Sequence, residues 1–272
     1  MCIRDSPYPL VLLFALVERL QWWSPSLRMA LAVSDSVADE VRSRARAGLS
    51  VATLPNSYDE TRFNAQVRHR YRDAMRRELG YKNDHQVFCF VSSGHYRRKG
   101  FWLAVEALAH LQPTVNGKSP RLLVVGGRAE TLDLLRSQVR RRFPGSEQWI
   151  TFAGMQTEVE KYYAASDAFI FPSHFEAFCL AEIEAAACGL PLLLTPHHGT
   201  EMILQDGING RLISINPTEM SRQLAQFIRE GLPKFTPNAG RGLSRNAYTS
   251  ALLKIYADLS ASLVSDPSQR SG

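Results

Sequence analysis

The sequence lacks the features of secreted and membrane-spanning proteins. Its 272 residues hold four cysteines, and none of them stands in a Cys-x-x-Cys pair. A disulfide framework or a zinc site is therefore not expected, and a reducing compartment is the default. The longest apolar run, Tyr8 to Val17, is too short to span a bilayer. Glu18, Arg19 and Gln21 follow it in place of a small-residue cleavage site, which argues against a signal peptide.

Several nucleotide- and metal-binding signatures are also missing. No Gly-x-Gly-x-x-Gly follows an expected strand, so a dehydrogenase is not expected. Residues 94–100 do not form a P-loop, because no glycine precedes Lys99 and no Ser or Thr follows it. No Asp-x-Asp pair or histidine cluster offers a divalent-metal site. His197 and His198 are expected to be surface residues of a loop, and no metal or other cofactor is predicted.

What the sequence does have is the composition of a globular protein, with 45% hydrophobic and 21% charged residues. Its length predicts about two domains. The formal net charge is +6 at pH 7. This charge suits an anionic ligand or a membrane surface, although many proteins without either partner carry a similar excess.

Short apolar segments alternate with helical segments through the second half of the chain. Residues 87–92 form a continuous apolar run, which is typical of a parallel strand covered on both faces. Strands that alternate with helices predict right-handed crossovers and a doubly wound parallel sheet. We therefore expect an α/β fold with one complete Rossmann-like domain over residues 86–235. Its strands are expected at 87–92, 121–126, 150–153, 168–171, 191–195 and 212–214, and its helices at 100–111, 132–142, 159–165, 180–188 and 218–230.

The flanking segments are predicted to belong to a second domain. Residues 7–60 form its carboxyl-terminal remnant, and residues 244–263 form a final amphipathic helix (246–263) that returns to it. Residues 61–85 are expected to be a basic linker with an exposed helix. Residues 1–6 join the next segment without a cap or turn signal, so we expect them not to be native. The remnant is predicted to hold helices at 9–23 and 35–46 and strands at 29–33 and 49–54, and the linker carries Arg68, Arg70, Arg72, Arg76 and Arg77.

Ligands of an open parallel sheet bind beyond the carboxyl ends of its strands. The first such loop, residues 93–100, contains Gly94, where a ligand can approach the backbone closely. Arg98 and Lys99 lie at the start of the following helix, where positive charge and the helix N-terminus together attract phosphate. Taken alone, this loop is equally compatible with an exposed basic turn.

The second such loop, residues 172–180, contains the acidic residue Glu176, and the helix after it contains Glu184. Glu184 lies in a helix that is otherwise mostly Ala, Ile, Leu and Cys, so its carboxylate needs a hydrogen-bond partner, and a sugar diol is a good one. Glu176 precedes this helix and could face further hydroxyls, while free amides near residues 178–180 point toward an anion. On chemistry alone, a helix-start charge at Glu176 and a solvent-exposed Glu184 explain the pattern equally well.

The run from Phe175 to Leu192 resembles the E-x7-E signature of retaining GT-B glycosyltransferases of the group 1 family. Glu176 and Glu184 occupy its two acidic positions, and Ser57 stands where that family usually has glycine. The likeness covers about residues 29–260 and is strongest to bacterial lipopolysaccharide-core glucosyltransferases. Further matching segments are residues 33–36, 55–59, 97–100, 165–173, 199–201 and 206–210.

This resemblance implies a GT-B fold and a nucleotide-sugar donor, UDP-linked, bound by the second domain. It implies that Glu184 binds the ribose hydroxyls, that Glu176 hydrogen-bonds the donor sugar, and that Arg98 and Lys99 neutralise the diphosphate leaving group. Because only about the last quarter to third of the first domain is present, we expect an N-terminally truncated form. We further expect the backbone of Gly94, Ala177, Phe178, Cys179 and Leu180 to complete this donor site.

The resemblance further implies a hexosyltransferase that retains configuration, needs no metal, and acts on a glycan or lipid-linked acceptor. Its expected place is the cytoplasm, with peripheral contact at the inner face of the cytoplasmic membrane. A non-catalytic module that binds UDP or a nucleotide-sugar is the alternative. A nucleic-acid partner is not expected, because only Tyr71 interrupts the basic residues 68–77 with an aromatic ring.

Overall fold

The structure, a computed structural model, describes residues 9–231 and 242–265. A parallel six-stranded sheet lies at its centre, in the order β5-β4-β3-β6-β7-β8. This order and direction confirm the predicted doubly wound α/β fold. The strands are β3 (His85–Val91), β4 (Ser119–Val125), β5 (Ile150–Gly154), β6 (Ala168–Phe171), β7 (Leu192–Leu194) and β8 (Gly210–Leu212).

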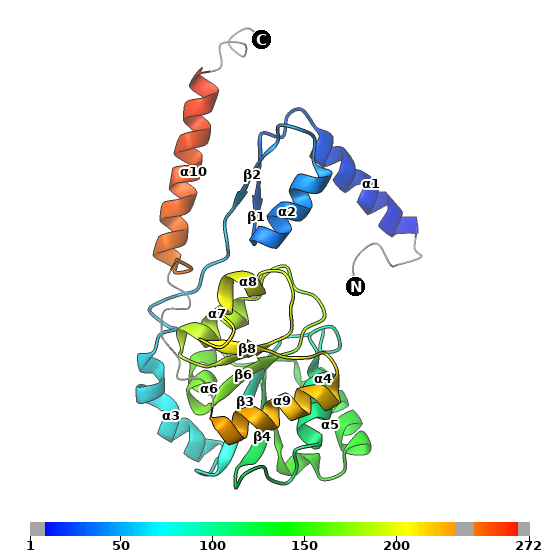
Figure 1. Cartoon of the computed structure of the whole chain (residues 1–272), viewed down its shortest axis with the longest axis vertical. Helices are drawn as coiled ribbons and strands as arrows, with labels where there is room; N and C mark the ends of the chain where they lie inside the picture. The colour runs from blue at the N-terminus through cyan, green and yellow to red at the C-terminus, as the bar shows by residue number, and fades with distance from the viewer. Residues whose placement is uncertain (1–8, 232–241, 266–272) are drawn as a thin grey trace.

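Helices cover both faces of this sheet. They are α3 (Gln66–Glu78), α4 (Phe101–Ala109), α5 (Ala129–Arg142), α6 (Val159–Ala165), α7 (Leu180–Ala187), α8 (Thr200–Ile203) and α9 (Pro217–Glu230), with a 3-10 turn at η2 (Ser146–Gln148). Figure 1 shows α3 and α6 on one side of the sheet and α4 and α5 on the other. Helix α9 packs against α4, and α3 packs against α6. The sheet is therefore buried on both faces, as its uninterrupted apolar strands predict.

The core of this domain is built from aromatic side chains of the central strands. Phe90 of β3 and Phe171 of β6 are fully buried, and their ring centroids lie 5.6 Å apart. Phe171 stacks in turn on Phe169, at 5.7 Å. Stacked and edge-on rings add to the free energy gained by removing apolar surface from water. This packing fixes the ends of β3 and β6, from which the two loops singled out in the sequence emerge.

The start of α9 shows why local sequence places a helix there. The side chain of Asn216 accepts hydrogen bonds from the backbone N–H groups of Thr218 (3.0 Å) and Glu219 (3.1 Å). Pro217 occupies the first helical position, where its missing N–H is not needed. The helix therefore begins at residue 217, one residue before the predicted start.

The amino-terminal part of the described chain forms a small separate unit. It consists of α1 (Pro9–Trp23), β1 (Met29–Ala32), α2 (Asp35–Arg44) and β2 (Ser50–Thr53), and β1 pairs with β2 in a parallel two-stranded sheet. Ser34 caps α2 by accepting a hydrogen bond from the N–H of Val37 at 3.3 Å. We call the part of the protein built around the six-stranded sheet the larger domain. The side chain of Ser36 donates a hydrogen bond to Glu201 of this larger domain at 2.8 Å. All four predicted elements of this unit are present within a few residues of their expected bounds.

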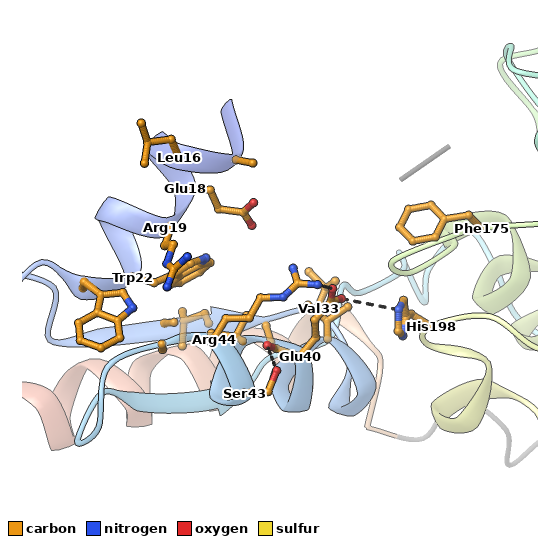
Figure 2. A pocket seen from close by; sticks show the side chains of 18 residues that line it. Leu16, Glu18, Arg19, Trp22, Val33, Glu40, Ser43, Arg44, Phe175 and His198 are labelled. Atoms are coloured by element: carbon orange, nitrogen blue, oxygen red, sulfur yellow. Dashed lines mark hydrogen bonds and ion pairs between the residues drawn. The ribbon is translucent and has the colours of Figure 1, made fainter. Parts of the chain in front are cut away.

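A cavity of about 1120 Å³ lies in this unit, between α1, β1 and α2. Figure 2 shows Trp22 of α1 and Arg44 and Glu40 of α2 at its border, with Phe175 and His198 of the larger domain facing it from the other side. The Nε2 atom of His198 lies 3.8 Å from a carboxylate oxygen of Glu40. The larger domain thus contributes a wall of this cavity next to Glu176.

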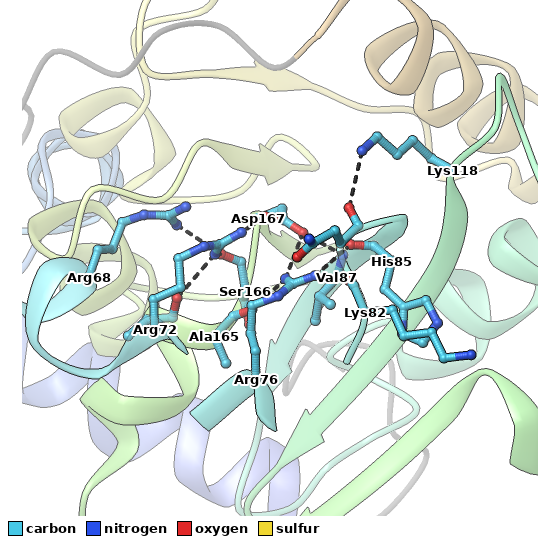
Figure 3. Close-up of polar contacts among 12 residues, drawn as sticks. Arg68, Arg72, Arg76, Lys82, His85, Val87, Lys118, Ala165, Ser166 and Asp167 are labelled. Atoms are coloured by element: carbon cyan, nitrogen blue, oxygen red, sulfur yellow. Dashed lines mark hydrogen bonds and ion pairs between the residues drawn. The ribbon is translucent and has the colours of Figure 1, made fainter. Parts of the chain in front are cut away.

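Helix α3 contradicts the prediction of an exposed basic helix within residues 61–85. Arg68, Arg72 and Arg76 lie four residues apart, so they share one face of the helix, and this face is turned inward (Figure 3). Arg76 is buried, and both Arg72 and Arg76 pair with Asp167. Arg68 donates to the carbonyl of Ser166 at 2.8 Å. The arginines on this face tie α3 to the α6–β6 connection, while Arg70 and Arg77 remain exposed.

Replacing Asp167 with asparagine is expected to lower the free energy of unfolding by about 2 kcal/mol. Asparagine keeps the shape but removes the charge from hydrogen bonds to two half-buried or buried guanidinium groups, and each such bond contributes about 1.5–3 kcal/mol. Urea unfolding followed by circular dichroism measures the change. The matched control is Asp73→Asn, at an exposed position of helix α3, and it should change stability by less than about 0.5 kcal/mol. Equal effects of the two variants would contradict the role given to Asp167.

The last helix, α10 (Arg245–Ser265), extends away from the sheet (Figure 1). Its start is held by the linker: Tyr58 N–H donates to Leu243 O and Arg245 N–H donates to Tyr58 O, each at 3.1 Å. The guanidinium of Arg245 also lies 3.0 Å from Asp59. The described side chains of α10 are exposed or half-buried. The predicted break at residues 233–240 and the expectation for residues 1–6 lie outside the described residues.

Candidate functional site

The candidate site lies where the strand order of the six-stranded sheet reverses. The chain passes from β3 outward to β4 and β5, then returns to β6 on the other side of β3. The loops that leave the carboxyl ends of β3 and β6 therefore both start at this switch point, the usual ligand position in such sheets. These are the loops of residues 92–100 and 172–179, the two that the sequence singles out.

The two loops are in direct contact with each other. The carbonyl of Arg98 accepts a hydrogen bond from His174 N–H at 2.9 Å and another from the Ser173 hydroxyl at 3.3 Å. Gly100 adopts φ +76°, and a Cβ atom there would lie 1.8 Å from the carbonyl oxygen of Pro172. The backbone of the basic loop is therefore fixed against the acidic loop at one edge of the sheet.

The side chains of Lys99 and Glu176 meet at this edge of the sheet. Their Nζ and Oε1 atoms lie 3.9 Å apart, and the two side chains are 20% and 12% exposed. The ammonium group also stands over the ring of Phe171, 5.3 Å from its centroid, which favours the cation. The Ser173 hydroxyl lies 3.4 Å from Glu176 Oε1. A positive and a negative group thus stand side by side, each partly open to a ligand.

The remaining groups of the basic loop also fit an anionic ligand. A Cβ atom at Gly94 would meet nothing within 4 Å, so the backbone there borders open space. His95 adopts φ +54°, a left-handed conformation that is uncommon for a residue with a side chain and often occurs at binding sites. The Nε atom of Arg98 is buried and has no hydrogen-bond partner among the described residues. These features leave unused hydrogen-bonding capacity in the loop.

Helix α7 begins directly beside this loop pair. Cys179 is its N-cap residue, and the first N–H groups of a helix have no partner within the helix. Phe178 and Cys179 have buried side chains, while Ala177 and Leu180 are exposed. Burial raises the pKa of the Cys179 thiol well above its usual range, which keeps it neutral. At Phe178 and Cys179 the side chains are therefore withdrawn from solvent, and only their backbone could meet a ligand.

Glu184 projects from the second turn of α7 into a half-buried position. Its Oε2 accepts a hydrogen bond from the hydroxyl of Tyr163 at 3.2 Å. Burial raises the pKa of Glu184 to about 7, opposed by the Tyr163 hydrogen bond and by the charge of Arg62. The alternative of a solvent-exposed Glu184 is therefore wrong. Sequence reasoning missed Tyr163 and Arg62, because they come from other parts of the chain.

The structure corrects the expectation that both histidines of the β7–α8 loop lie on the surface. The side chain of His197 is 1% exposed, and its Nε2 lies 2.9 Å from Oε1 of Glu182, which is fully buried. Burial lowers the pKa of His197, but the carboxylate of Glu182 outweighs this and raises it above its usual value. His198 is half-buried. The signal available in the sequence was Glu182 itself, a third carboxylate among the apolar residues of α7.

Comparison with known proteins finds a family match over the part of the chain that contains the six-stranded sheet. Residues 85–230, more than half of the chain, match the family described as "Glycosyl transferases group 1". The chain belongs to this family. Its likeness to known structures confirms the predicted GT-B fold, with a Rossmann-like domain around the six-stranded sheet.

Two curated relatives of this group 1 glycosyltransferase illustrate the range of the family. A D-inositol 3-phosphate glycosyltransferase of Actinosynnema mirum is 32% identical over 221 residues, covering 76% of this chain and 51% of the relative. The lipopolysaccharide core biosynthesis glycosyltransferase LpsE of Rhizobium meliloti is 30% identical over 176 residues, covering 61% and 49%. The chain therefore spans about half the length of these relatives.

A solved structure of similar fold is that of Anabaena HepE in complex with UDP-glucose. It superposes with a TM-score of 0.71 at 19% identity, over 85% of this chain and 64% of that one. Within the described residues of this group 1 glycosyltransferase, no three His, Cys, Asp or Glu side chains gather as metal ligands would. No helix in residues 9–231 or 242–265 has the length and apolar character needed to traverse a bilayer.

Proposed function

We propose that this protein is a retaining glycosyltransferase that takes its sugar from a UDP-linked donor, without a metal ion, and passes it to a glycan or lipid-linked acceptor. The observation that carries the proposal is the meeting of Lys99 and Glu176, 3.9 Å apart, at the switch point of the sheet. A nucleotide-sugar presents phosphates and sugar hydroxyls side by side, and these two groups match that pairing.

The diphosphate is assigned to the basic loop and the start of α7. Lys99 and Arg98 supply fixed positive charge, and the amides of residues 177–180 supply oriented N–H groups. When the bond between the anomeric carbon and the phosphate breaks, negative charge develops on the leaving diphosphate. Groups that are already in place stabilise that charge without reorganising, so no metal ion is required for this purpose.

The sugar and the ribose are assigned to the two carboxylates of the signature. Glu176 hydrogen-bonds the hydroxyls of the donor sugar, and its position beside Lys99 keeps it close to the reacting carbon. Glu184 accepts hydrogen bonds from the two ribose hydroxyls, while Tyr163 holds its carboxylate from the other side. Gly94 borders the open space through which the donor approaches the backbone.

The binding of UDP-glucose to the chain, measured by calorimetry in the presence of a chelator, tests the proposal. Lys99→Ala is expected to weaken this binding at least about tenfold, because a charge-assisted contact contributes about 1.5–3 kcal/mol. Lys118→Ala is the matched control: this lysine lies at the amino end of β4, where its Nζ contacts Asn83 O at 3.2 Å. In a version extended to the length of the relatives, Lys99→Ala should abolish turnover. Normal affinity in the variant would remove Lys99 from the site.

The identity of the nucleotide follows from a thermal-shift screen of UDP-, GDP- and ADP-sugars without metal. A ligand that binds only the folded state stabilises it in proportion to the logarithm of its concentration over its dissociation constant. We expect the UDP-sugars to shift the melting temperature most. A larger shift with GDP- or ADP-sugars would reassign the donor while leaving the transferase proposal in place.

Peripheral contact with an anionic membrane is proposed from the net charge and the exposed apolar side chains of α1. Leu13, Phe14, Leu16 and Leu20 of this helix are each more than half exposed. Apolar surface next to a basic protein suits the boundary of an anionic bilayer. Co-sedimentation with phosphatidylglycerol vesicles should decrease as salt rises, and binding that does not depend on salt or vesicle charge would refute this contact.

A further inference from the structure

The buried pair of His197 and Glu182 has no part in the donor contacts assigned above. Both side chains are almost completely inaccessible, and their Nε2 and Oε1 atoms lie 2.9 Å apart. Besides His197, the Glu182 carboxylate has the thiol of Cys179 as a polar neighbour. Taking a carboxylate and an imidazole out of water is costly, and apolar residues of similar volume in their place are often neutral or stabilising. A polar pair at this position therefore calls for an explanation other than stability.

The pair joins two segments that frame the donor site. Glu182 lies in the first turn of α7, which follows directly on the loop that carries Glu176. His197 lies in the β7–α8 loop, where its Nδ1 is 3.0 Å from the Thr200 hydroxyl and 3.1 Å from His198 O. The imidazole of His197 thus links the β7–α8 loop to α7 through Nε2, which contacts Glu182. Its other nitrogen, Nδ1, contacts groups within the β7–α8 segment itself.

The same β7–α8 loop supports the segment that carries Glu176. At its start, the Thr195 hydroxyl donates to Ser173 O at 2.6 Å. Further along, a Cβ atom at Gly199 would lie 3.1 Å from the ring of Phe178 and 3.3 Å from Ala177 O, so the two backbones are closely packed. Residues 173–178 are therefore held at both ends by the β7–α8 loop, whose orientation depends on His197.

We propose that His197 and Glu182 are positioning residues for the donor site: their buried contact holds the β7–α8 loop against residues 173–178 and so places Glu176 and the amides of residues 177–180 for the donor. This inference rests on the proposed function of the site. Neither side chain touches the donor, and both act through the loop that they hold.

The charge of the pair makes this positioning dependent on pH. Burial raises the pKa of Glu182, and the contact with His197 opposes that rise. The charge of Glu176 acts on both members of the pair: it disfavours the carboxylate form of Glu182 and favours protonated His197. Above the raised pKa of His197, the imidazole becomes neutral and the attraction to Glu182 is lost. Donor affinity should therefore fall as pH rises through that value.

The experiment compares UDP-glucose affinity between pH 7 and pH 9 in three proteins. Wild type is expected to lose affinity toward pH 9. The double variant Glu182→Leu with His197→Leu, which replaces the pair by apolar side chains and should fold, is expected to lack this alkaline loss and to keep only the rise in affinity toward pH 8 that ionisation of Glu184 gives. His197→Gln, which keeps hydrogen-bonding capacity but leaves Glu182 buried without a counter-charge, is expected to bind about tenfold more weakly at pH 7, a loss of about 1.4 kcal/mol.

The outcomes separate this inference from the proposed function. An alkaline loss of affinity that persists in the double variant, or that wild type does not show, overturns the positioning role while donor binding stands. Absence of UDP-glucose binding by wild type at every pH overturns the proposed function and this inference together. A loss seen in wild type and removed by the double substitution, with weaker binding by His197→Gln, supports both.

Discussion

Glu184→Gln is expected to make the protein more stable at pH 8 and its donor binding weaker. The folded-state pKa of Glu184, about 7, lies above the ordinary value of 4.5 because its carboxyl group is buried. The folded state therefore holds the proton more tightly than the unfolded state. The stabilisation that protonation provides is fully present below about pH 4.5 and is lost as pH rises through 7.

The size of this effect follows from the difference of about 2.5 between the two pKa values, which corresponds to about 3 kcal/mol as an upper bound. Glutamine keeps the hydrogen bond to Tyr163 and never ionises, so at pH 8 the variant avoids that cost. We expect a gain of about 1–3 kcal/mol at pH 8, equivalent to a rise of several degrees in melting temperature, and almost none at pH 4. Thermal melts at the two pH values measure it.

The same substitution should weaken UDP-glucose binding about tenfold at pH 8, because a neutral amide accepts hydrogen bonds from the ribose less strongly than a carboxylate. Wild-type affinity should fall as pH drops from 8 to 6, since Glu184 becomes protonated, and the variant should not show this dependence. Glu158→Gln, at an exposed acidic residue before α6, is the matched control. A variant with unchanged stability at pH 8 and unchanged affinity would exclude Glu184 from the donor site.

Gly100→Ala is expected to destabilise the protein by more than about 4 kcal/mol, enough to prevent folding of the larger domain. The added Cβ atom would lie 1.8 Å from the carbonyl oxygen of Pro172, which is backbone and cannot move aside without separating the two site loops. The φ angle of +76° adds about 1–2 kcal/mol for an L side chain. Urea unfolding, or the yield of folded protein where the variant does not fold, measures the loss.

Gly80→Ala separates the two causes. Gly80 also has a positive φ, +70°, but a Cβ atom there would meet nothing within 4 Å. This control therefore reports the conformational cost alone, about 1–2 kcal/mol. If both variants lose the same stability, the contact between residue 100 and Pro172 does not constrain the loops.

The fold was accessible from the sequence because its signals are local and repeated. The apolar strands of the larger domain are bounded by turns and alternate with helices, so their parallel arrangement follows from connection rules alone. Helix α8 was not predicted, because its four residues are too few to show a period. The contact of Lys99 with Glu176 could be expected, since both follow strands that end at the same edge.

The errors concern polar side chains whose partners are distant in sequence. Arg72 and Arg76 seemed to belong to a solvated helix, and only their shared face could have suggested a common partner, Asp167, about ninety residues away. His197 was expected on the surface because its carboxylate partner, Glu182, lies on a separate element. Periodicity reports which residues face the core, but it does not report which buried charge pairs with which.

The junction at Tyr58 and Leu243–Arg245 has a consequence for movement. The two chain segments that connect the larger domain to the rest of the protein are hydrogen-bonded to each other at this point. A swivel of the amino-terminal unit needs dihedral changes in only a few residues beside it, and α10, anchored at Arg245, would be carried along. Rotation about this pivot would change the spacing between the amino-terminal unit and the wall of the cavity formed by Phe175 and His198, while Lys99 and Glu176, both of the larger domain, would keep their contact.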